Sequence, residues 1–304
     1  MASASISQRT SDTATGELSF NNEAVSLCML VNRRHQVVRV IDFRAGATLA
    51  KRNFVLNVAR REGIEKVFLL VERDEVTTWS RLGLRREGSI PGFYRRSDAW
   101  IMGAVVNNVG PVRGDTMYDD DDDVDDEPNP ALELAEKHID KAKKVVKETI
   151  DRPLPPTKVA VIRRDVALKA VAAATKAGRA MTGFELFSRD AERHYLSVTG
   201  KGSFELCASY EVQPSFASSM LEILVGPRNE AERALTTSAL KTLLGKLGEI
   251  NATSTFTIAP ADDVLLSSCF LAAGFRKSAV LASHVDVGGK RRDAIVWSKK
   301  LADN

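Results

Sequence analysis

The chain has 304 residues, a hydrophobic fraction of 44% and a net charge of +3, which suits about two globular domains. Its low aromatic content of 6% disfavours a nucleic-acid-binding surface built on base stacking. The first twenty residues are rich in Ser and Thr and lack the apolar run of an export signal, and no segment is apolar enough to span a bilayer. We therefore expect a cytoplasmic protein without a membrane segment.

The metal-ligating residue types are dispersed along the chain. Three cysteines lie far apart inside apolar runs, at Cys28, Cys207 and Cys269, as buried thiols of a reducing compartment do. The four histidines show no ligand spacing with one another or with the cysteines. We therefore expect no metal ion.

The first part of the chain predicts a disordered tail at residues 1–20 and a partial α/β domain at residues 21–108. The domain is expected to contain strands at Val25–Asn32, Gln36–Phe43 and Lys66–Val71, a helix at Leu49–Glu62, a second helix at Asp74–Leu82 with Asp74 as its N-cap, and a strand pair over Leu84–Val106. The pair Pro91-Gly92 predicts a bend or bulge within the first strand of that pair.

Residues 109–130 predict a linker, because they contain Gly, Pro and an acidic run at 119–127. Outside this run, 43 basic residues face 32 acidic ones, a net charge of +11. Residues 131–152 predict a connector helix with one apolar stripe. The helix at 131–150 and the acidic run are candidate contacts for a protein partner, and the basic remainder is a candidate surface for anions.

Residues 153–304 predict a complete second α/β domain. Its pattern predicts strands at Lys158–Ile162, Phe184–Tyr195, Ser203–Val212, Met220–Val225 and Thr255–Ala259, helices at Asp165–Ala180, Glu230–Leu247 and Asp262–Ala273, and a closing strand pair over Gly274–Leu301.

This order of elements resembles the Gcn5-related N-acetyltransferase (GNAT) fold. In that family a fourth strand, a helix, a fifth strand, a helix and two closing strands follow one another, as they do from Met220 to Leu301. The first half matches from the third strand onward, over Val25–Val106, without the family's N-terminal helices. The words LGLRREGSIPGFYRRSDAWIM resemble the closing segment of β-lysine acetyltransferases in that superfamily.

The resemblance implies an α/β (α+β) fold with two acetyltransferase-like mixed sheets flanked by helices. The first domain would be truncated, and the acidic linker and the connector helix would join it to the second. The resemblance also implies acetyl-CoA as cosubstrate, with its pyrophosphate bound at a helix N-terminus after the fourth strand.

The family signature at that turn is Arg/Gln-x-x-Gly-x-Gly/Ala, and both copies here depart from it. The first copy is one residue out of register, and in the second copy Pro227 has no N–H and Glu230 brings a negative charge. By resemblance, the candidate acetyl-CoA-binding residues are Arg44, Gly46, Ala47, Thr48 and Leu49 in the first copy, and Gly226, Arg228 and Asn229 in the second. The alternative interpretation is an ordinary strand-to-helix turn.

The family's catalytic acid is often a Tyr four residues before the Gly that follows its last helix. Trp79 and Phe270 stand at the two corresponding positions, and neither can supply a proton. Candidate bases that could deprotonate an amine are Asp42 and Glu222, each on the fourth strand of its copy. A carboxylate at a strand end is, however, more often solvated or paired than catalytic.

Three functions follow from these patterns. The first is an N-acyltransferase that moves an acetyl group from acetyl-CoA to an amine. The second is a catalytically inactive tandem of acetyltransferase-like domains that serves as a binding or assembly module. The third is a basic nucleic-acid-binding protein, which the scattered basic pairs without interleaved aromatic residues disfavour.

Overall fold

The structure is a computed structural model. It describes residues 5–11, 15–21, 25–42, 46–94, 97–110, 130–189, 191–213, 218–250 and 252–301, with the backbone alone for 5–11 and 213. The candidate Arg44 and the acidic run at 119–127 lie outside the described residues.

The first half is a sheet covered by helices on one face. Its elements are β1 (Ser5–Ser11), β2 (Thr15–Asn21), β3 (Ser26–Asn32), β4 (Val37–Asp42), α1 (Leu49–Arg61), β5 (Lys66–Val71), a 3-10 turn (Arg73–Glu75), α2 (Val76–Arg81), β6 (Arg85–Ile90), β7 (Ala99–Val105) and a second 3-10 turn (Val106–Asn108). The continuously apolar β5 pairs in parallel with β4, as a strand buried on both faces does.

The second half follows the predicted order of strands and helices. Its elements are α3 (Pro130–Thr149), β8 (Lys158–Ile162), α4 (Arg164–Lys176), β9 (Arg193–Thr199), β10 (Glu205–Gln213), β11 (Ser218–Ile223), α5 (Glu230–Glu249), β12 (Ser254–Pro260), α6 (Val264–Ala272), β13 (Arg276–Val287) and β14 (Lys290–Lys300). The predicted mixed α/β fold class is confirmed.

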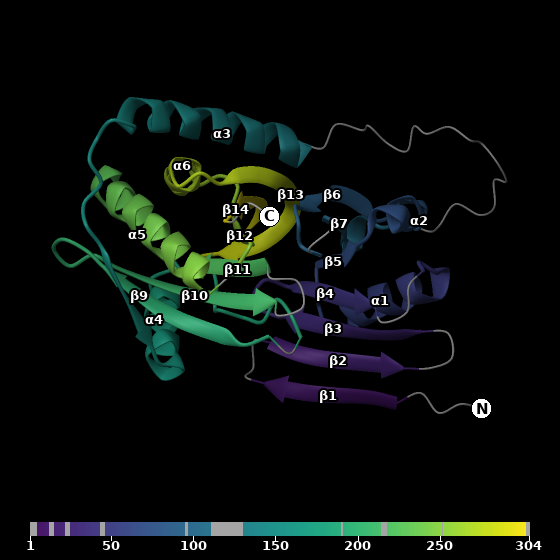
Figure 1. Cartoon of the computed structure of the whole chain (residues 1–304). Coiled ribbons are helices and arrows are strands. Elements are labelled where there is room, and N and C mark those ends of the chain that lie inside the picture. The colour runs from purple at the N-terminus through teal and green to yellow at the C-terminus, as the bar shows by residue number, and fades with distance from the viewer. Residues whose placement is uncertain are drawn as a thin grey trace.

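In the described residues, fourteen strands form one continuous sheet in the order β1-β2-β3-β4-β5-β7-β6-β13-β14-β12-β11-β10-β9-β8. The order of the first seven strands therefore recurs in reverse in the second seven. The two halves meet where β6 pairs antiparallel with β13, at Gly88 and Ala279. The sequence left open whether the halves share a sheet, and they do (Figure 1).

The three largest apolar clusters among the described residues lie along this sheet. One lies beneath α1 and α2 on the outer face of the first half. Another lies beneath α3, α5 and α6 on the outer face of the second half. The third contains Phe68 and Ile101 of the first half together with Phe256 and Leu281 of the second, so the inner faces of the two half-sheets pack against each other.

The helix α3 packs on its own chain. Its stripe of Ala135, Ile139 and Ala142 is buried, it contacts α6 and β13, and Glu136 pairs with Lys277. Figure 1 shows α3 lying over α6. These three residues are therefore covered within this chain, whereas Leu132 and Leu134 of the same helix are exposed.

Four local predictions were wrong. The predicted tail contains the antiparallel pair β1 and β2, because β3 offers β2 an edge to pair with. The predicted strand from Phe184 begins at Arg193, because positive φ at Phe184 breaks extended backbone.

The Asp74 side chain caps neither the 3-10 turn nor α2. Pro91 follows β6 rather than interrupting it, and the irregular pairing of β6 lies between Arg86 and Gly88.

Candidate functional site

The predicted base Asp42 lies at the end of β4 in an ion pair. Its Oδ2 is 2.6 Å from Lys51 Nζ, and the Lys51 side chain is 3% exposed. The same ammonium donates to the carbonyl of Gly46 at 2.8 Å. Lys51 therefore fills the space between the end of β4 and the turn that follows it.

The first turn is satisfied by groups of the chain itself. The Gly46 N–H donates to Glu75 Oε1 at 2.9 Å, and the Thr48 side chain caps α1 by accepting from the Lys51 N–H. Ala47 is half-buried and Leu49 is exposed. A carboxylate thus binds the glycine N–H that the resemblance assigns to a phosphate.

The second turn shows the same arrangement. The Arg228 N–H donates to Glu232 Oε2 at 2.8 Å, and the Arg228 guanidinium pairs with the same carboxylate at 2.6 Å. Asn229 caps α5 by accepting from the Glu232 N–H at 3.0 Å. Gly226, Arg228 and Asn229 line one open cavity of about 270 Å³ together with Arg179 and Lys201.

The strands beside this turn separate toward their carboxyl ends. Pairing of β11 with β12 covers Ser218–Met220 and Ser254–Phe256, although both strands continue further. Beyond the separated ends, a Cβ placed on Gly226 would lie 2.7 Å from Asp263 Oδ2. A side chain on Gly226 would therefore have no room beside Asp263.

The turns do not fit acetyl-CoA as they stand. Its phosphates would have to displace the carboxylates of Glu75 or Glu232 from the N–H groups, and like charges repel there. Trp79 and Phe270, at the family's tyrosine positions, are 3% and 0% exposed in the two outer cores. The chain therefore holds no proton donor at those positions.

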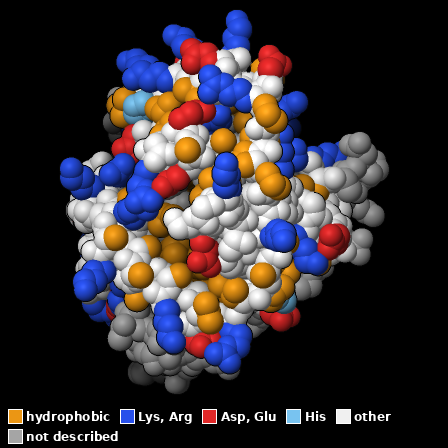
Figure 2. Space-filling view, turned by 90° about the vertical axis from the view of Figure 1, so that its left-hand side faces the viewer, with side chains coloured by type: hydrophobic (Ala, Val, Ile, Leu, Met, Phe, Trp, Pro, Cys, Tyr) orange, Lys and Arg blue, Asp and Glu red, His pale blue; other side chains and the backbone are white. Residues whose placement is uncertain are grey.

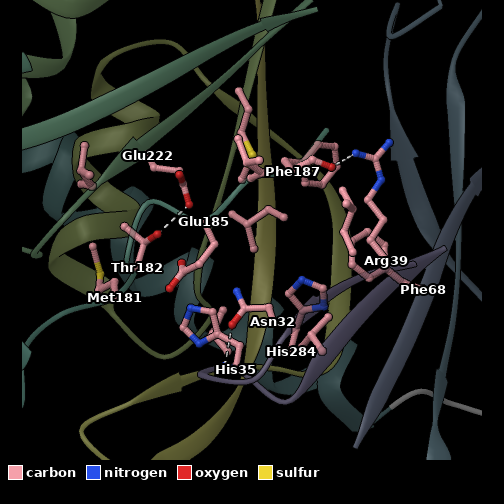
Figure 3. Close-up of a pocket in the computed structure, with 17 residues that line it drawn as sticks. Asn32, His35, Arg39, Phe68, Met181, Thr182, Glu185, Phe187, Glu222 and His284 are labelled. Carbon is pink, nitrogen blue, oxygen red and sulfur yellow. Dashed lines mark hydrogen bonds between the residues drawn. The ribbon is translucent and has the colours of Figure 1, made fainter. Parts of the chain in front are cut away.

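A different cavity, of about 80 Å³, lies between the inner faces of the two halves (Figure 3). A cavity needs roughly 10–15 Å³ to hold one water, so a small organic molecule has room. Its polar lining comes from both halves: Asn32, His35 and Arg39 from the first, and Thr182, Glu185, Glu222 and His284 from the second. Its apolar lining includes Leu30, Met181 and Ile258.

The second predicted base, Glu222 on β11, lines this cavity but is already paired. Its Oε1 accepts from the Thr182 hydroxyl at 2.7 Å, and its Oε2 pairs with Arg193. Arg193 also binds Glu211 at 2.8 Å. Burial by itself lowers the pKa of Arg193, but Glu222 and Glu211 hold it above its ordinary value, so the guanidinium stays charged.

Glu185 is the carboxylate of the lining without a counterion. Its Oε2 accepts the Gly183 N–H at 2.9 Å, and no Lys or Arg in the described part of the chain forms an ion pair with it. In the view of Figure 3 its carboxylate lies between Thr182 and His35, which also line the cavity. A half-buried carboxylate without a cation attracts one.

Two histidines of the lining are neutral at pH 7. Burial, reinforced by Arg34, lowers the pKa of His35 to about 4, and its Nδ1 accepts the Asp286 N–H at 3.0 Å. Burial and the nearby Lys66 hold the pKa of His284 well below its ordinary value. The His284 Nδ1 is buried without a hydrogen-bond partner.

Backbone strain gathers around the same cavity. In the described chain, three non-glycine residues have positive φ: Gln36 at 49°, Phe184 at 61° and Ser283 at 47°. Each is a direct neighbour in sequence of a lining residue, namely His35, Glu185 and His284. Such conformations are costly and concentrate at functional sites, which supports a ligand-binding role for the cavity.

The sequence singled out Glu222 as a candidate base, and the structure places it in the lining of this cavity. The other polar residues of the lining were not anticipated. His35 was assigned to a tight connection between strands, and Glu185 to the first part of a strand that begins only at Arg193. Their roles depend on contacts between the halves, so no local pattern could have identified them.

No family model and no curated protein matches the chain. Among solved structures it is similar to the dodecameric spermidine N-acetyltransferase from Vibrio cholerae (10% identity, 48% of this chain and 94% of that chain, TM-score 0.39). It is also similar to a candidate acetyltransferase from Sphaerobacter thermophilus DSM 20745 (15% identity, 49% of this chain and 96% of that chain, TM-score 0.35). A third similar structure is a candidate phosphinothricin N-acetyltransferase (15% identity, 49% of this chain and 100% of that chain, TM-score 0.38). TM-scores this low carry no conclusion about activity.

No helix among the described residues is long and apolar enough to cross a membrane, and no group of three or more His, Cys, Asp or Glu residues gathers there as a metal site. On the face shown in Figure 2, Lys and Arg are spread among acidic side chains rather than gathered in one stripe. That face lacks the continuous basic patch typical of nucleic-acid binding.

Proposed function

We propose that this chain is a tandem of two acetyltransferase-like domains that binds a small organic amine between its halves without acetylating it. The observation that carries the proposal is the Glu185 carboxylate, which lines a cavity and has no counterion in the described chain. An ammonium ion supplies the missing charge, and the apolar lining by Leu30, Met181 and Ile258 suits a short carbon chain.

Contacts within the chain disfavour acetyl transfer. Carboxylates of the chain bind the turn N–H groups of Gly46 and Arg228. Both candidate bases are held in ion pairs, Asp42 by Lys51 and Glu222 by Arg193, so each already binds a cation of the chain. These contacts favour a binding module over a transferase.

Calorimetric titration with n-butylamine tests the binding step. We expect a Kd on the order of 1 mM for so small a ligand. Glu185→Gln keeps an oxygen for the Gly183 N–H and removes the charge, so binding should weaken by about tenfold or more. Glu192→Gln makes the same change at a side chain that is 84% exposed and should leave binding unchanged. Equal affinity of Glu185→Gln and wild type would overturn the proposal.

An N-acyltransferase is the second candidate, because Glu222 lies on β11 and lines the cavity in which an amine would bind. Mass spectrometry of n-butylamine incubated with protein and acetyl-CoA separates the two functions. The binding module predicts no N-acetylated product and no rise in melting temperature at about 1 mM acetyl-CoA, since a ligand that binds the native state raises it. A product that forms at catalytic turnover would establish the transferase.

A further inference from the structure

We propose that the first half selects the ligand through two hydrogen-bond donors, the Asn32 amide and the His35 imidazole. The ligand is then a primary amine that also carries an uncharged acceptor, such as a hydroxyl or amide oxygen. This inference rests on the proposed function, because the amine must first bind at Glu185.

The Asn32 amide is oriented by the turn to which it belongs. Its Oδ1 accepts the His35 N–H at 3.0 Å, so its NH₂ group is directed away from the turn. Figure 3 shows that nitrogen pointing into the cavity. An amide nitrogen is a donor alone, and it therefore calls for an acceptor on the ligand.

The His35 ring has one possible tautomer when neutral. Because its Nδ1 accepts the Asp286 N–H at 3.0 Å, the ring proton belongs on Nε2, which becomes a donor. Contacts to the second half fix the turn: Arg291 donates to the His35 carbonyl at 2.6 Å, and Arg34 donates to the Ala180 carbonyl at 3.1 Å. The second half thus holds the first half's donors in place.

The groups around the cavity bear on the type of acceptor. Arg39 is a cation of the lining, and its guanidinium donates to two neutral groups, the Phe187 carbonyl and the Ser188 hydroxyl at 3.2 Å. The donors that the turn supplies, the Asn32 amide and the neutral His35 ring, are uncharged, and an uncharged oxygen matches them without a second charge on the ligand.

Three probes of similar size test this selection by calorimetry with the full chain: 4-aminobutan-1-ol, n-pentylamine and 4-aminobutyrate. We expect the amino alcohol to bind about 3- to 10-fold more tightly than n-pentylamine, as one or two neutral hydrogen bonds provide. n-Pentylamine has a methyl group in place of the hydroxyl, and burial of that methyl group favours n-pentylamine. Tighter binding of the amino alcohol therefore requires that its hydrogen bonds outweigh this gain. Tighter binding of 4-aminobutyrate than of the amino alcohol would assign the acceptor to the Arg39 guanidinium and overturn the inference.

Two variants test whether the Asn32 and His35 donors cause the preference for the amino alcohol. Asn32→Asp keeps the acceptor for the His35 N–H and loses the amide donor, and His35→Asn keeps an acceptor near the Asp286 N–H and loses the Nε2 donor. Each variant should reduce the affinity ratio of amino alcohol to n-pentylamine toward one. An equal affinity of the two probes for wild type, or a ratio that survives in both variants, overturns the inference and leaves amine binding intact. Failure of all three probes to bind wild type overturns the proposed function as well.

Discussion

Gly88 on β6 and Ala279 on β13 join the two halves of the sheet at a contact too close for a side chain on the glycine. A Cβ on Gly88 would lie 2.4 Å from the Ala279 Cβ, and Gly88 has a φ of +138°. Gly88→Ala should therefore lower the free energy of unfolding by roughly 2–4 kcal/mol, through the clash and the strained backbone together.

Urea unfolding monitored by circular dichroism measures this cost. Gly92→Ala is the matched control, because Gly92 also has positive φ but has open space around it; it should cost only about 1 kcal/mol. If the two variants lose the same stability, the close junction is not what joins the halves.

A buried ion pair lies next to this junction. Lys66 on β5 is fully buried and pairs with Glu87 on β6, and Glu87 Oε1 also accepts the Ala282 N–H of β13 at 3.1 Å. Lys66→Met should cost roughly 3–5 kcal/mol, because it leaves a buried carboxylate without its cation. The double variant Lys66→Met with Glu87→Gln should recover part of that loss, since the glutamine still offers an oxygen to Ala282.

A double-mutant cycle from urea midpoints gives the coupling between the two side chains. Additive losses in the double variant would contradict a direct pair between them.

The order of helices and strands could be predicted from the sequence, but the junction between β6 and β13 could not. The continuous apolar run of β5 and the helix that begins after Thr48 follow from local periodicity and capping. The pairing of Gly88 with Ala279 joins segments far apart in the chain, so no local pattern encodes it. The same holds for the cavity, where Asn32 and Glu185 come together only because the inner faces pack.

His35 makes stability depend on pH in a defined window. Its pKa is about 4 in the folded chain against an ordinary 6.5, so the unfolded chain binds more protons between these values. Its contribution is therefore fully present above pH 6.5 and is lost as pH falls toward 4, by roughly 3 kcal/mol in total.

Urea unfolding of wild type and His35→Asn between pH 7 and pH 4 isolates this effect from other titrating groups. The stability curves should converge as pH falls, because the variant has no imidazole at this position. Curves that stay parallel over the whole range would contradict a neutral, buried His35.

Substitution of Arg193 should lower the stability of the protein far more than substitution of an exposed arginine. It is 4% exposed and pairs with both Glu211 and Glu222, so Arg193→Lys should cost roughly 2–4 kcal/mol by losing the fork that binds two carboxylates. Arg228→Lys, at a side chain that is 65% exposed, should cost much less stability, because water screens a surface ion pair. Thermal unfolding compares the pair, and similar losses would argue against the Arg193 network.

The most direct test is a crystal soaked with n-butylamine and acetyl-CoA together. We predict density for the amine in the cavity between the halves, with its nitrogen at the Glu185 carboxylate. We also predict no acetyl-CoA density at the Gly226–Asn229 turn or at the turn that contains Gly46. Acetyl-CoA bound at either turn, with Glu75 or Glu232 displaced, would contradict this account and favour the acetyltransferase.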